Sequence, residues 1–123
     1  MPKVSKDTAP HVEDIGPLLG RYGELDGYTV GFEHFREDAD ATPLFKGLPD
    51  DRCQAPHWGY VLAGQLVVTY TNETQETCST NDLFYWPPGH SVRVVENAEV
   101  VLFSPYREHT QVLDHMLARM GSD

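Results

Sequence analysis

The chain is poor in basic residues and in long apolar runs, and each shortage excludes a class of protein. Only 9 Lys and Arg residues stand against 19 Asp and Glu residues, which gives a formal net charge of −10 over 123 residues. This charge repels nucleic-acid phosphates and anionic lipids, so we expect neither nucleic acid nor a membrane as a partner. No apolar run approaches the roughly 20 residues that a membrane-spanning helix needs.

Cysteine is also scarce, and several catalytic motifs are missing. The chain has two cysteines, Cys53 and Cys78, and its first residues lack the apolar core of a secretory signal. We therefore expect a cytoplasmic protein without a disulfide between the two thiols. The sequence contains no Gly-rich phosphate loop, no dinucleotide fingerprint and no Ser-His-Asp order, and no residue stands out as a general base.

What the sequence does contain is a succession of short strand-like segments. Residues 28–35 alternate, with Tyr28, Val30, Phe32 and His34 on one face. Further segments rich in β-branched and aromatic residues are expected to be strands, at 58–63, 65–71, 75–79, 82–86, 91–95 and 100–103. Short strands at regular spacing predict an all-β sandwich or barrel. A chain of this length forms one domain.

The two ends depart from the strand pattern. Residues 1–27 are rich in Pro and Gly and predict an irregular arm with at most one short strand, ahead of a barrel at 28–104. Ser104 before Pro105 indicates the start of a helix in the C-terminal segment 105–123, with Gly121 as its stop signal. Apolar residues recur at helical spacing along it: Leu113, Met116, Leu117 and Met120. This helix is expected to cover a sheet of its own chain or of a neighbouring subunit. Four histidines are expected to be solvated or hydrogen-bonded rather than ligands: His11, His34, His109 and His115.

Two segments concentrate candidate metal ligands. Cys53 and His57 have the same parity on an extended chain, so both can face one interior. Thiolate and imidazole are ligands that zinc, copper and iron accept. A third imidazole, His90, directly follows the rigid turn Pro87-Pro88-Gly89, and Asp51 is a fourth candidate. A lone buried cysteine can equally be an apolar filler, and His57 can simply donate to a carbonyl.

The spacing of these residues resembles the two signature motifs of the cupin superfamily. The first motif reads G-x5-H-x-H-x3or4-E-x6-G. Counted back from Gly64, His57 lies at the position of its glutamate, Cys53 at its second histidine and Asp51 at its first. The positions of the motif's three ligands are therefore kept, but different residue types occupy them.

The second motif, G-x5-P-x-G-x2-H-x3-N, is matched in part. Pro87 and Gly89 agree, whereas Val92 replaces the metal-binding histidine, and Asn81 and Glu96 replace the first and last residues. His90 lies two residues before Val92 and would face the same side of an extended chain, which makes it the natural substitute ligand. The resemblance covers residues 28–104. The segments P-H-W-G-Y-V-L and P-P-G-H also resemble those of small actinobacterial single-domain cupins.

The resemblance implies a double-stranded β-helix, the cupin jelly-roll barrel, with a metal and a small-molecule ligand in its pocket. The metal would be a divalent transition ion held by Cys53, His57 and His90, with zinc favoured by the thiolate and iron, nickel or copper left open. Asp51 would accept a hydrogen bond from His57, and Cys53 would be a thiolate near neutral pH. Aromatic residues on the outside of the barrel suggest a homodimer.

Two functions remain open at this point. One is a metal-dependent enzyme of small-molecule metabolism. The other is a non-catalytic module that binds or senses a small molecule without metal. Part of the aromatic set would line the pocket in either case, because strand alternation divides these residues between two faces: Trp58, Tyr60, Phe84, Tyr85 and Trp86.

Overall fold

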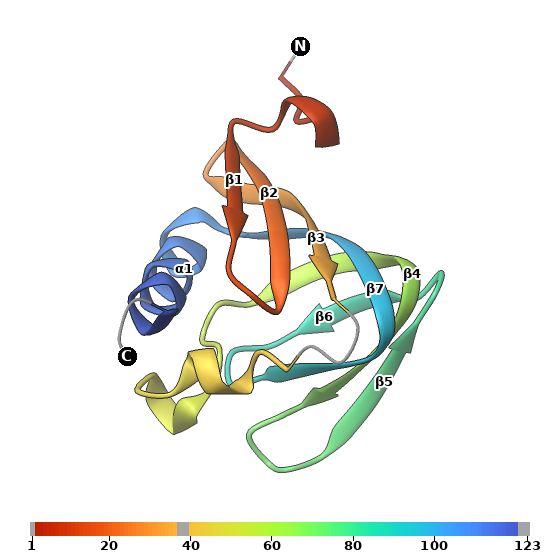
Figure 1. Cartoon of the computed structure of the whole chain (residues 1–123), viewed down its shortest axis with the longest axis vertical. Helices are drawn as coiled ribbons and strands as arrows, with labels where there is room; N and C mark the ends of the chain where they lie inside the picture. The colour runs from red at the N-terminus through yellow and green to blue at the C-terminus, as the bar shows by residue number, and fades with distance from the viewer. Residues whose placement is uncertain (1, 37–39, 121–123) are drawn as a thin grey trace.

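The computed structural model describes residues 2–36 and 40–120, which form a β-barrel with one C-terminal helix (Figure 1). Its strands are β1 (His11–Asp14), β2 (Leu18–Leu25), β3 (Tyr28–Phe35), β4 (His57–Thr69), β5 (Gln75–Ser79), β6 (Leu83–Trp86) and β7 (Ser91–Pro105). They precede the helix α1 (Tyr106–Met120). The expected all-β jelly roll is therefore confirmed.

The strands pair antiparallel in the order β1-β2-β3-β7-β4-β5, and β6 pairs with β4. The two long strands create the barrel, because β4 and β7 pair along most of their length while their two halves have different neighbours. The first part of β4 pairs with β6 and the last part with β5. The sequence predicted two strands in place of each long strand. The expected breaks are instead places where a continuous strand bends.

The bend in β4 depends on Gly64. The pairing of β4 with β7 shifts register three times between Val61 and Leu66, and Gly64 has a φ of +86°. A side chain at this position would overlap the carbonyl oxygen of Asn97 and the backbone of Ala98. Only glycine allows the two strands to approach this closely at a positive φ.

Gly64→Ala is therefore expected to lower the free energy of unfolding by about 2–4 kcal/mol, since backbone strain and overlap add together. Gly16→Ala is the matched control. Gly16 also has a positive φ, +77°, but no atom lies within 4 Å of the added carbon. The control should lose only about 1 kcal/mol. Urea unfolding of both variants measures the difference, and equal losses would contradict the packing argument.

The N-terminal region is more regular than its Pro and Gly content predicted. Instead of an irregular arm, it forms β1 and β2, and β2 pairs with the whole of β3. The turn between β2 and β3 is Asp26-Gly27, with φ of 51° and 84°, a pair that favours tight hairpins. The barrel sheet therefore begins at His11 rather than at Tyr28.

Helix α1 closes one end of the barrel (Figure 1). It lies against β3, β7 and the short 3-10 helix Thr42–Phe45, and its buried side chains are His109, Val112 and Met116. The helix starts one residue later than expected, because Pro105 still belongs to β7. The Ser104 hydroxyl does not cap it but donates to the carbonyl of Pro56 at 2.7 Å.

Three further expectations concern this helix. Its apolar side covers the barrel of its own chain, so it needs no second subunit. Met120, expected within the apolar stripe, is 42% exposed. The expected stop at Gly121 lies outside the described residues.

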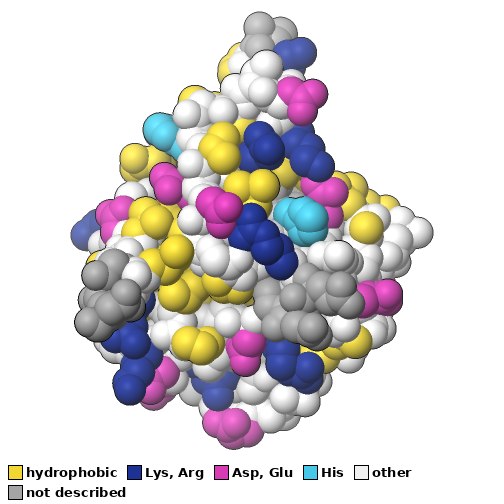
Figure 2. Space-filling view, viewed as in Figure 1, with side chains coloured by type: hydrophobic (Ala, Val, Ile, Leu, Met, Phe, Trp, Pro, Cys, Tyr) yellow, Lys and Arg dark blue, Asp and Glu magenta, His cyan; other side chains and the backbone are white. Residues whose placement is uncertain are grey.

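The surface carries mixed charges. On the face shown in Figure 2, Lys and Arg side chains are interspersed with Asp and Glu side chains. Within residues 2–36 and 40–120, no helix is both long and apolar enough to cross a membrane.

Candidate metal centre

The backbone locks the two candidate ligand segments together. Cys53 follows the short 3-10 helix Pro49–Asp51 and forms an isolated antiparallel bridge with His90. The amide of Cys53 donates to the carbonyl of His90 at 2.8 Å, and the amide of Gly89 donates to the carbonyl of Cys53 at 2.7 Å. His57 is the first residue of β4 and pairs with Trp86 of β6. Three segments thus deliver the three side chains from fixed backbone positions.

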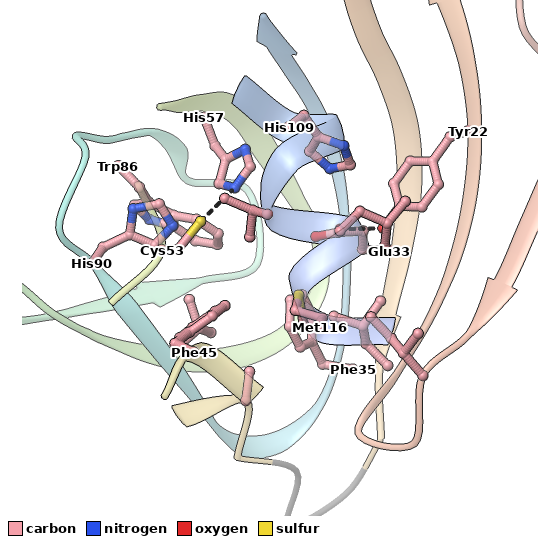
Figure 3. A pocket seen from close by; sticks show the side chains of 16 residues that line it. Tyr22, Glu33, Phe35, Phe45, Cys53, His57, Trp86, His90, His109 and Met116 are labelled. Carbon is pink, nitrogen blue, oxygen red and sulfur yellow. Dashed lines mark hydrogen bonds between the residues drawn. The ribbon is translucent and has the colours of Figure 1, made fainter. Parts of the chain in front are cut away.

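The three side chains converge on one point (Figure 3). One ligand atom from each of Cys53, His57 and His90 lies within 4.8 Å of the others. Cys53 Sγ and His57 Nε2 are 3.7 Å apart, and the two imidazole rings have centroids 5.0 Å apart. All three residues are buried, with exposed fractions of 2%, 8% and 1%. The sequence therefore identified three residues that do meet inside the barrel.

The proline-glycine turn orients His90 as expected. Gly89 has a φ of +95°, and His90 Nδ1 donates to the carbonyl oxygen of Pro87 at 2.7 Å. Because a carbonyl can only accept, the proton of the neutral ring lies on Nδ1. His90 Nε2 therefore keeps its lone pair, which is the state a metal ligand requires.

The prediction for Asp51 is wrong. Its side chain is exposed, and its Oδ1 accepts a hydrogen bond from the amide of Gly47 at 2.9 Å. The positive φ of 55° at Asp51 turns the chain away from the interior before Cys53 returns to it. His57 Nδ1 is consequently buried without a hydrogen-bond partner among the described residues. Asp51 is neither a ligand nor the acceptor for His57.

Burial keeps all three groups neutral in the metal-free protein. It raises the pKa of the Cys53 thiol to about 12, and the nearby Glu33 carboxyl acts in the same direction. It lowers the pKa of His57 well below its ordinary value and that of His90 to about 4. The expected low pKa of Cys53 is therefore wrong for the metal-free state, because no charged imidazole lies beside it. A bound dication would remove the thiol proton.

The donor set fits a four-coordinate divalent metal. With Zn–S bonds of about 2.3 Å and Zn–N bonds of about 2.0–2.1 Å, tetrahedral ligands lie roughly 3.3–3.8 Å apart. The distance of 3.7 Å between Cys53 Sγ and His57 Nε2 already meets this requirement. Since no pair exceeds 4.8 Å, the side chains need to close by at most about 1 Å. Three protein ligands leave one position open.

The centre lies at the wall of a small cavity of about 40 Å³. A single water needs at least about 10–15 Å³, so the space holds an ion with a few waters. It is far smaller than the roughly 300 Å³ of typical ligand pockets. Apart from the three candidate ligands, the lining residues are Ile15, Leu18, Tyr22, Glu33, Phe35, Ala41, Phe45, Trp86, Val92, His109, Val112, Leu113 and Met116.

A second group of polar side chains faces the same cavity, and the sequence did not predict it. Glu33 on β3 is buried, and its Oε2 accepts a hydrogen bond from the hydroxyl of Tyr22 on β2 at 2.5 Å. The ring of His109 on α1 lies edge-on to Tyr22, with centroids 5.0 Å apart, and to His57, with centroids 5.7 Å apart. His109 was expected to be solvated or hydrogen-bonded. It is buried, and burial lowers its pKa to about 4.

Tyr22, His109 and Leu113 separate the cavity from the outside. A hollow of about 290 Å³ lies between the β1–β2 hairpin and α1 and shares these three residues with the inner cavity. Its rim includes the acidic residues Glu13 and Glu24. A ligand that enters by this hollow would pass the three shared side chains.

The aromatic residues divide between two faces, as strand alternation predicted. Trp86 lines the cavity and stacks on Phe84, with centroids 3.9 Å apart. Trp58 and Tyr85 stack on each other on the outer face of the barrel, with centroids 5.0 Å apart.

Comparison with known proteins identifies the architecture. No protein-family model and no curated protein matches the sequence. Among solved structures, an RmlC-like cupin from Shewanella frigidimarina covers 89% of this chain and 96% of its own, with 20% identity and a TM-score of 0.64. KdgF from a Halomonas species covers 89% and 99%, with 18% identity and a TM-score of 0.63. The chain has the cupin fold.

The cupin fold also occurs as part of a larger neighbour. A variant of the Bacillus subtilis oxalate decarboxylase matches 82% of this chain but only 28% of its own length, with 19% identity and a TM-score of 0.64. At such identities these likenesses establish the cupin fold, and the chemistry has to be argued from the site. Cys53 and His57 came from the first cupin motif, and both face the barrel interior. Val92, at the position of the missing histidine, lines the cavity together with His90.

Proposed function

We propose that this cupin-fold protein binds one divalent transition metal, preferably zinc, through Cys53, His57 and His90 and acts as a metal-dependent enzyme on a small molecule. The convergence of three buried donor atoms within 4.8 Å carries this proposal. Buried polar groups are costly unless they are paired. A metal would pair the three facing donor atoms, among them Cys53 Sγ and His57 Nε2. His57 Nδ1, which has no partner in the described structure, is the other nitrogen of its ring and would stay unpaired.

The arrangement supports catalysis more than a structural role. Structural zinc sites are usually closed by four protein ligands, whereas catalytic sites keep an open position. When bound here, the metal would supply a Lewis acid or an activated water. The residues of the chain would fix its position, exclude bulk water and hold the reacting molecule between the centre and Glu33. The hollow between the β1–β2 hairpin and α1 is the proposed route of entry.

The alternative function is a module that binds or senses a small molecule without metal. The largely apolar wall of the cavity favours this alternative, because it would hold a small apolar molecule without any chemistry. The two functions differ in whether a metal ion stays bound at Cys53, His57 and His90. Only the first requires a metal ion in stoichiometric amount.

Elemental analysis of protein purified without added metal tests the proposal. We expect about one transition-metal ion per chain, or its quantitative uptake when zinc is added at micromolar concentration, because the three donors are preorganised. A protein that is isolated without metal and takes up none would contradict the proposal and favour the alternative.

We also propose that the protein is a homodimer. The outer face of β7, β4 and β6 carries directly paired uncharged residues, including the exposed row Phe103, Trp58 and Tyr85. Phe103 is 50% exposed and Leu83 of β6 is 82% exposed. Two copies with a net charge of −10 repel each other unless they meet through an uncharged face. A two-fold axis would pair this face with itself.

Phe103→Asp is expected to convert the dimer to a monomer in sedimentation velocity at micromolar concentration, because it places two like charges at the two-fold contact. Val12→Asp is the control, since Val12 is 52% exposed on β1, away from this face. A monomeric wild type would contradict the proposed dimer.

A further inference from the structure

Glu33 is a buried carboxyl group without a cation to stabilise it. Its side chain is on β3, the residue is 7% exposed, and it is the only buried Asp or Glu among the described residues. Its hydrogen-bond partner is the Tyr22 hydroxyl, and no ion pair joins it within the described parts of the chain. Burying an ionisable carboxyl without a cation costs several kcal/mol once it ionises. Stability therefore does not explain why a carboxyl is present here.

The carboxyl and the candidate metal centre share one cavity. Glu33 lines the cavity on the side opposite Cys53, His57 and His90 (Figure 3). With about 40 Å³ of space between the walls, a few waters or a molecule of few atoms fill the gap. Any molecule held at the centre therefore lies close to Glu33.

Tyr22 fixes the orientation of this carboxyl. Tyr22 is itself 3% exposed and donates its hydroxyl hydrogen to Glu33 Oε2. Among the described residues, no group donates to Glu33 Oε1. One oxygen is thus held by the protein, and the other is free to accept a proton from a molecule in the cavity.

We propose that Glu33 is the proton acceptor of this cavity and that the ligand is a small uncharged molecule with an ionisable O–H group, bound between Glu33 and the Cys53–His57–His90 centre. This inference rests on the proposed metal-dependent function. In the proton-transfer step the O–H bond of the ligand breaks and its proton bonds to Glu33 Oε1. The electron pair stays on the ligand oxygen, where the positive charge of the centre stabilises it. The reverse step returns the proton.

The surroundings of Glu33 support both parts of the proposal. Burial raises the pKa of Glu33 to about 7 and the hydrogen bond from Tyr22 opposes the rise, so the group accepts and returns a proton near neutrality. The titratable groups that face the cavity with it are Tyr22 from β2, Cys53, His57 and His90 from the centre, and His109 from α1. A carboxylate within apolar walls disfavours an anionic ligand, and the positive charge of the proposed metal centre disfavours a cationic one, which leaves neutral molecules.

The visible spectrum of the Co²⁺-loaded protein tests the proton acceptor, with water as the molecule in the cavity. We expect the wild-type spectrum to change with pH in a step at or below about 7, since the positive centre lowers the pKa that burial gives Glu33. Glu33→Gln should bind Co²⁺ and lose this step. Tyr22→Phe should move the step to higher pH, because the Tyr22 hydrogen bond holds the pKa of Glu33 down.

A second tyrosine–glutamate pair provides the matched control. The Tyr70 hydroxyl donates to Glu76 Oε1 at 2.7 Å on the exposed side of the barrel. Glu76→Gln should leave the spectral step unchanged. If Glu33 is only a structural partner of Tyr22, glutamine can still accept that hydrogen bond and the wild-type step will persist in Glu33→Gln. That result would overturn the inference while leaving the metal centre intact, whereas failure to bind Co²⁺ would contradict the proposed function itself.

Two probes of similar size test the ligand class on the Co²⁺-loaded protein. Acetohydroxamic acid is neutral with an ionisable O–H, and acetate is an anion. Glu33→Gln should weaken the binding of acetohydroxamic acid at least about tenfold, because the proton acceptor is lost, and should strengthen that of acetate, because the repelling carboxylate is gone. Equal affinities in the two proteins, or binding of neither probe, would overturn the assigned ligand class.

Discussion

Replacing His90 by alanine, or Cys53 by serine, is expected to weaken zinc binding by more than about 100-fold, because loss of an outer partner of a ligand alone costs 10–100-fold. His90 is a direct donor whose Nε2 is made available by the hydrogen bond from Nδ1 to Pro87. Cys53 supplies the thiolate that favours zinc over harder ions. Competition with a chromophoric chelator measures the affinity.

The matched controls for these variants are Cys78→Ser and His34→Ala. Cys78 is the second free cysteine, also buried, but on β5 and outside the cavity lining. His34 is exposed and bonds to Asn97. Both controls should bind zinc like the wild type. Wild-type affinity in Cys53→Ser and His90→Ala would show that the three-donor centre does not hold the metal.

The metal-free protein is expected to lose stability as the pH falls from 7 to 5. His90 and His109 have a folded-state pKa of about 4, below the ordinary value of 6.5. Protons therefore bind the unfolded chain first, which stabilises it as the pH falls below 6.5. Each histidine removes about 2 kcal/mol of unfolding free energy by pH 5. The pKa of His57 is also lowered, and this effect has the same sign.

Glu33 works in the opposite direction. Its folded-state pKa of about 7 lies above the ordinary value of 4.5, so between these values the folded chain binds the proton first. Protonation of Glu33 between pH 7 and pH 5 therefore raises the free energy of unfolding by about 2 kcal/mol. The wild type should lose at least about 2 kcal/mol over this interval and Glu33→Gln at least about 4 kcal/mol.

Urea unfolding of both proteins at pH 7 and pH 5, in the presence of a chelator, measures this difference. The comparison between the two proteins is the informative quantity, since other surface carboxyl groups contribute equally to both. A wild type that is as stable at pH 5 as at pH 7 would contradict the buried neutral imidazoles. A Glu33→Gln variant that loses no more stability than the wild type would contradict the opposing buried carboxyl.

Much of the fold could be predicted because the residue patterns of most segments match the way in which these segments pack in the barrel. The alternating β-branched and aromatic segments became strands, and the apolar stripe of the last segment became the helix that covers the barrel. Strand continuity was not predictable, because Gly64 looks like a turn residue. In the structure it allows a bend within β4. The β1–β2 hairpin was missed because Gly16 and Pro17 form its turn and because Gly20 and Gly23 lie within β2 itself, where glycine usually indicates a break.

The candidate site likewise includes residues that could be predicted from the sequence and others that could not. The convergence of Cys53, His57 and His90 could be predicted because motif spacing places His57 at the start of β4 and Cys53 and His90 on two segments that the backbone bridges. Glu33 could not, because the interior face of β3 carries Thr29, Gly31 and Glu33, which looks polar beside the alternating face that includes Tyr28 and Phe32.

His109 left a detectable signal. It shares helical spacing with Val112 and Met116, the other buried residues of α1, so it lies on the covered face of the helix. The prediction for Asp51 failed for a local reason. Asp51 has a positive φ, which is not visible in the sequence and which turns its side chain outward.

X-ray absorption spectroscopy of the zinc-loaded protein tests the central claim most directly, because it counts and identifies the atoms bound to the metal. The structure leads us to expect one sulfur at about 2.3 Å and two imidazole nitrogens at about 2.0–2.1 Å, with one further light atom in the open position. The sulfur contribution should vanish in Cys53→Ser and persist in Cys78→Ser. A first coordination sphere without sulfur, or with oxygen and nitrogen atoms typical of a surface-bound ion, would contradict a metal centre formed by Cys53, His57 and His90.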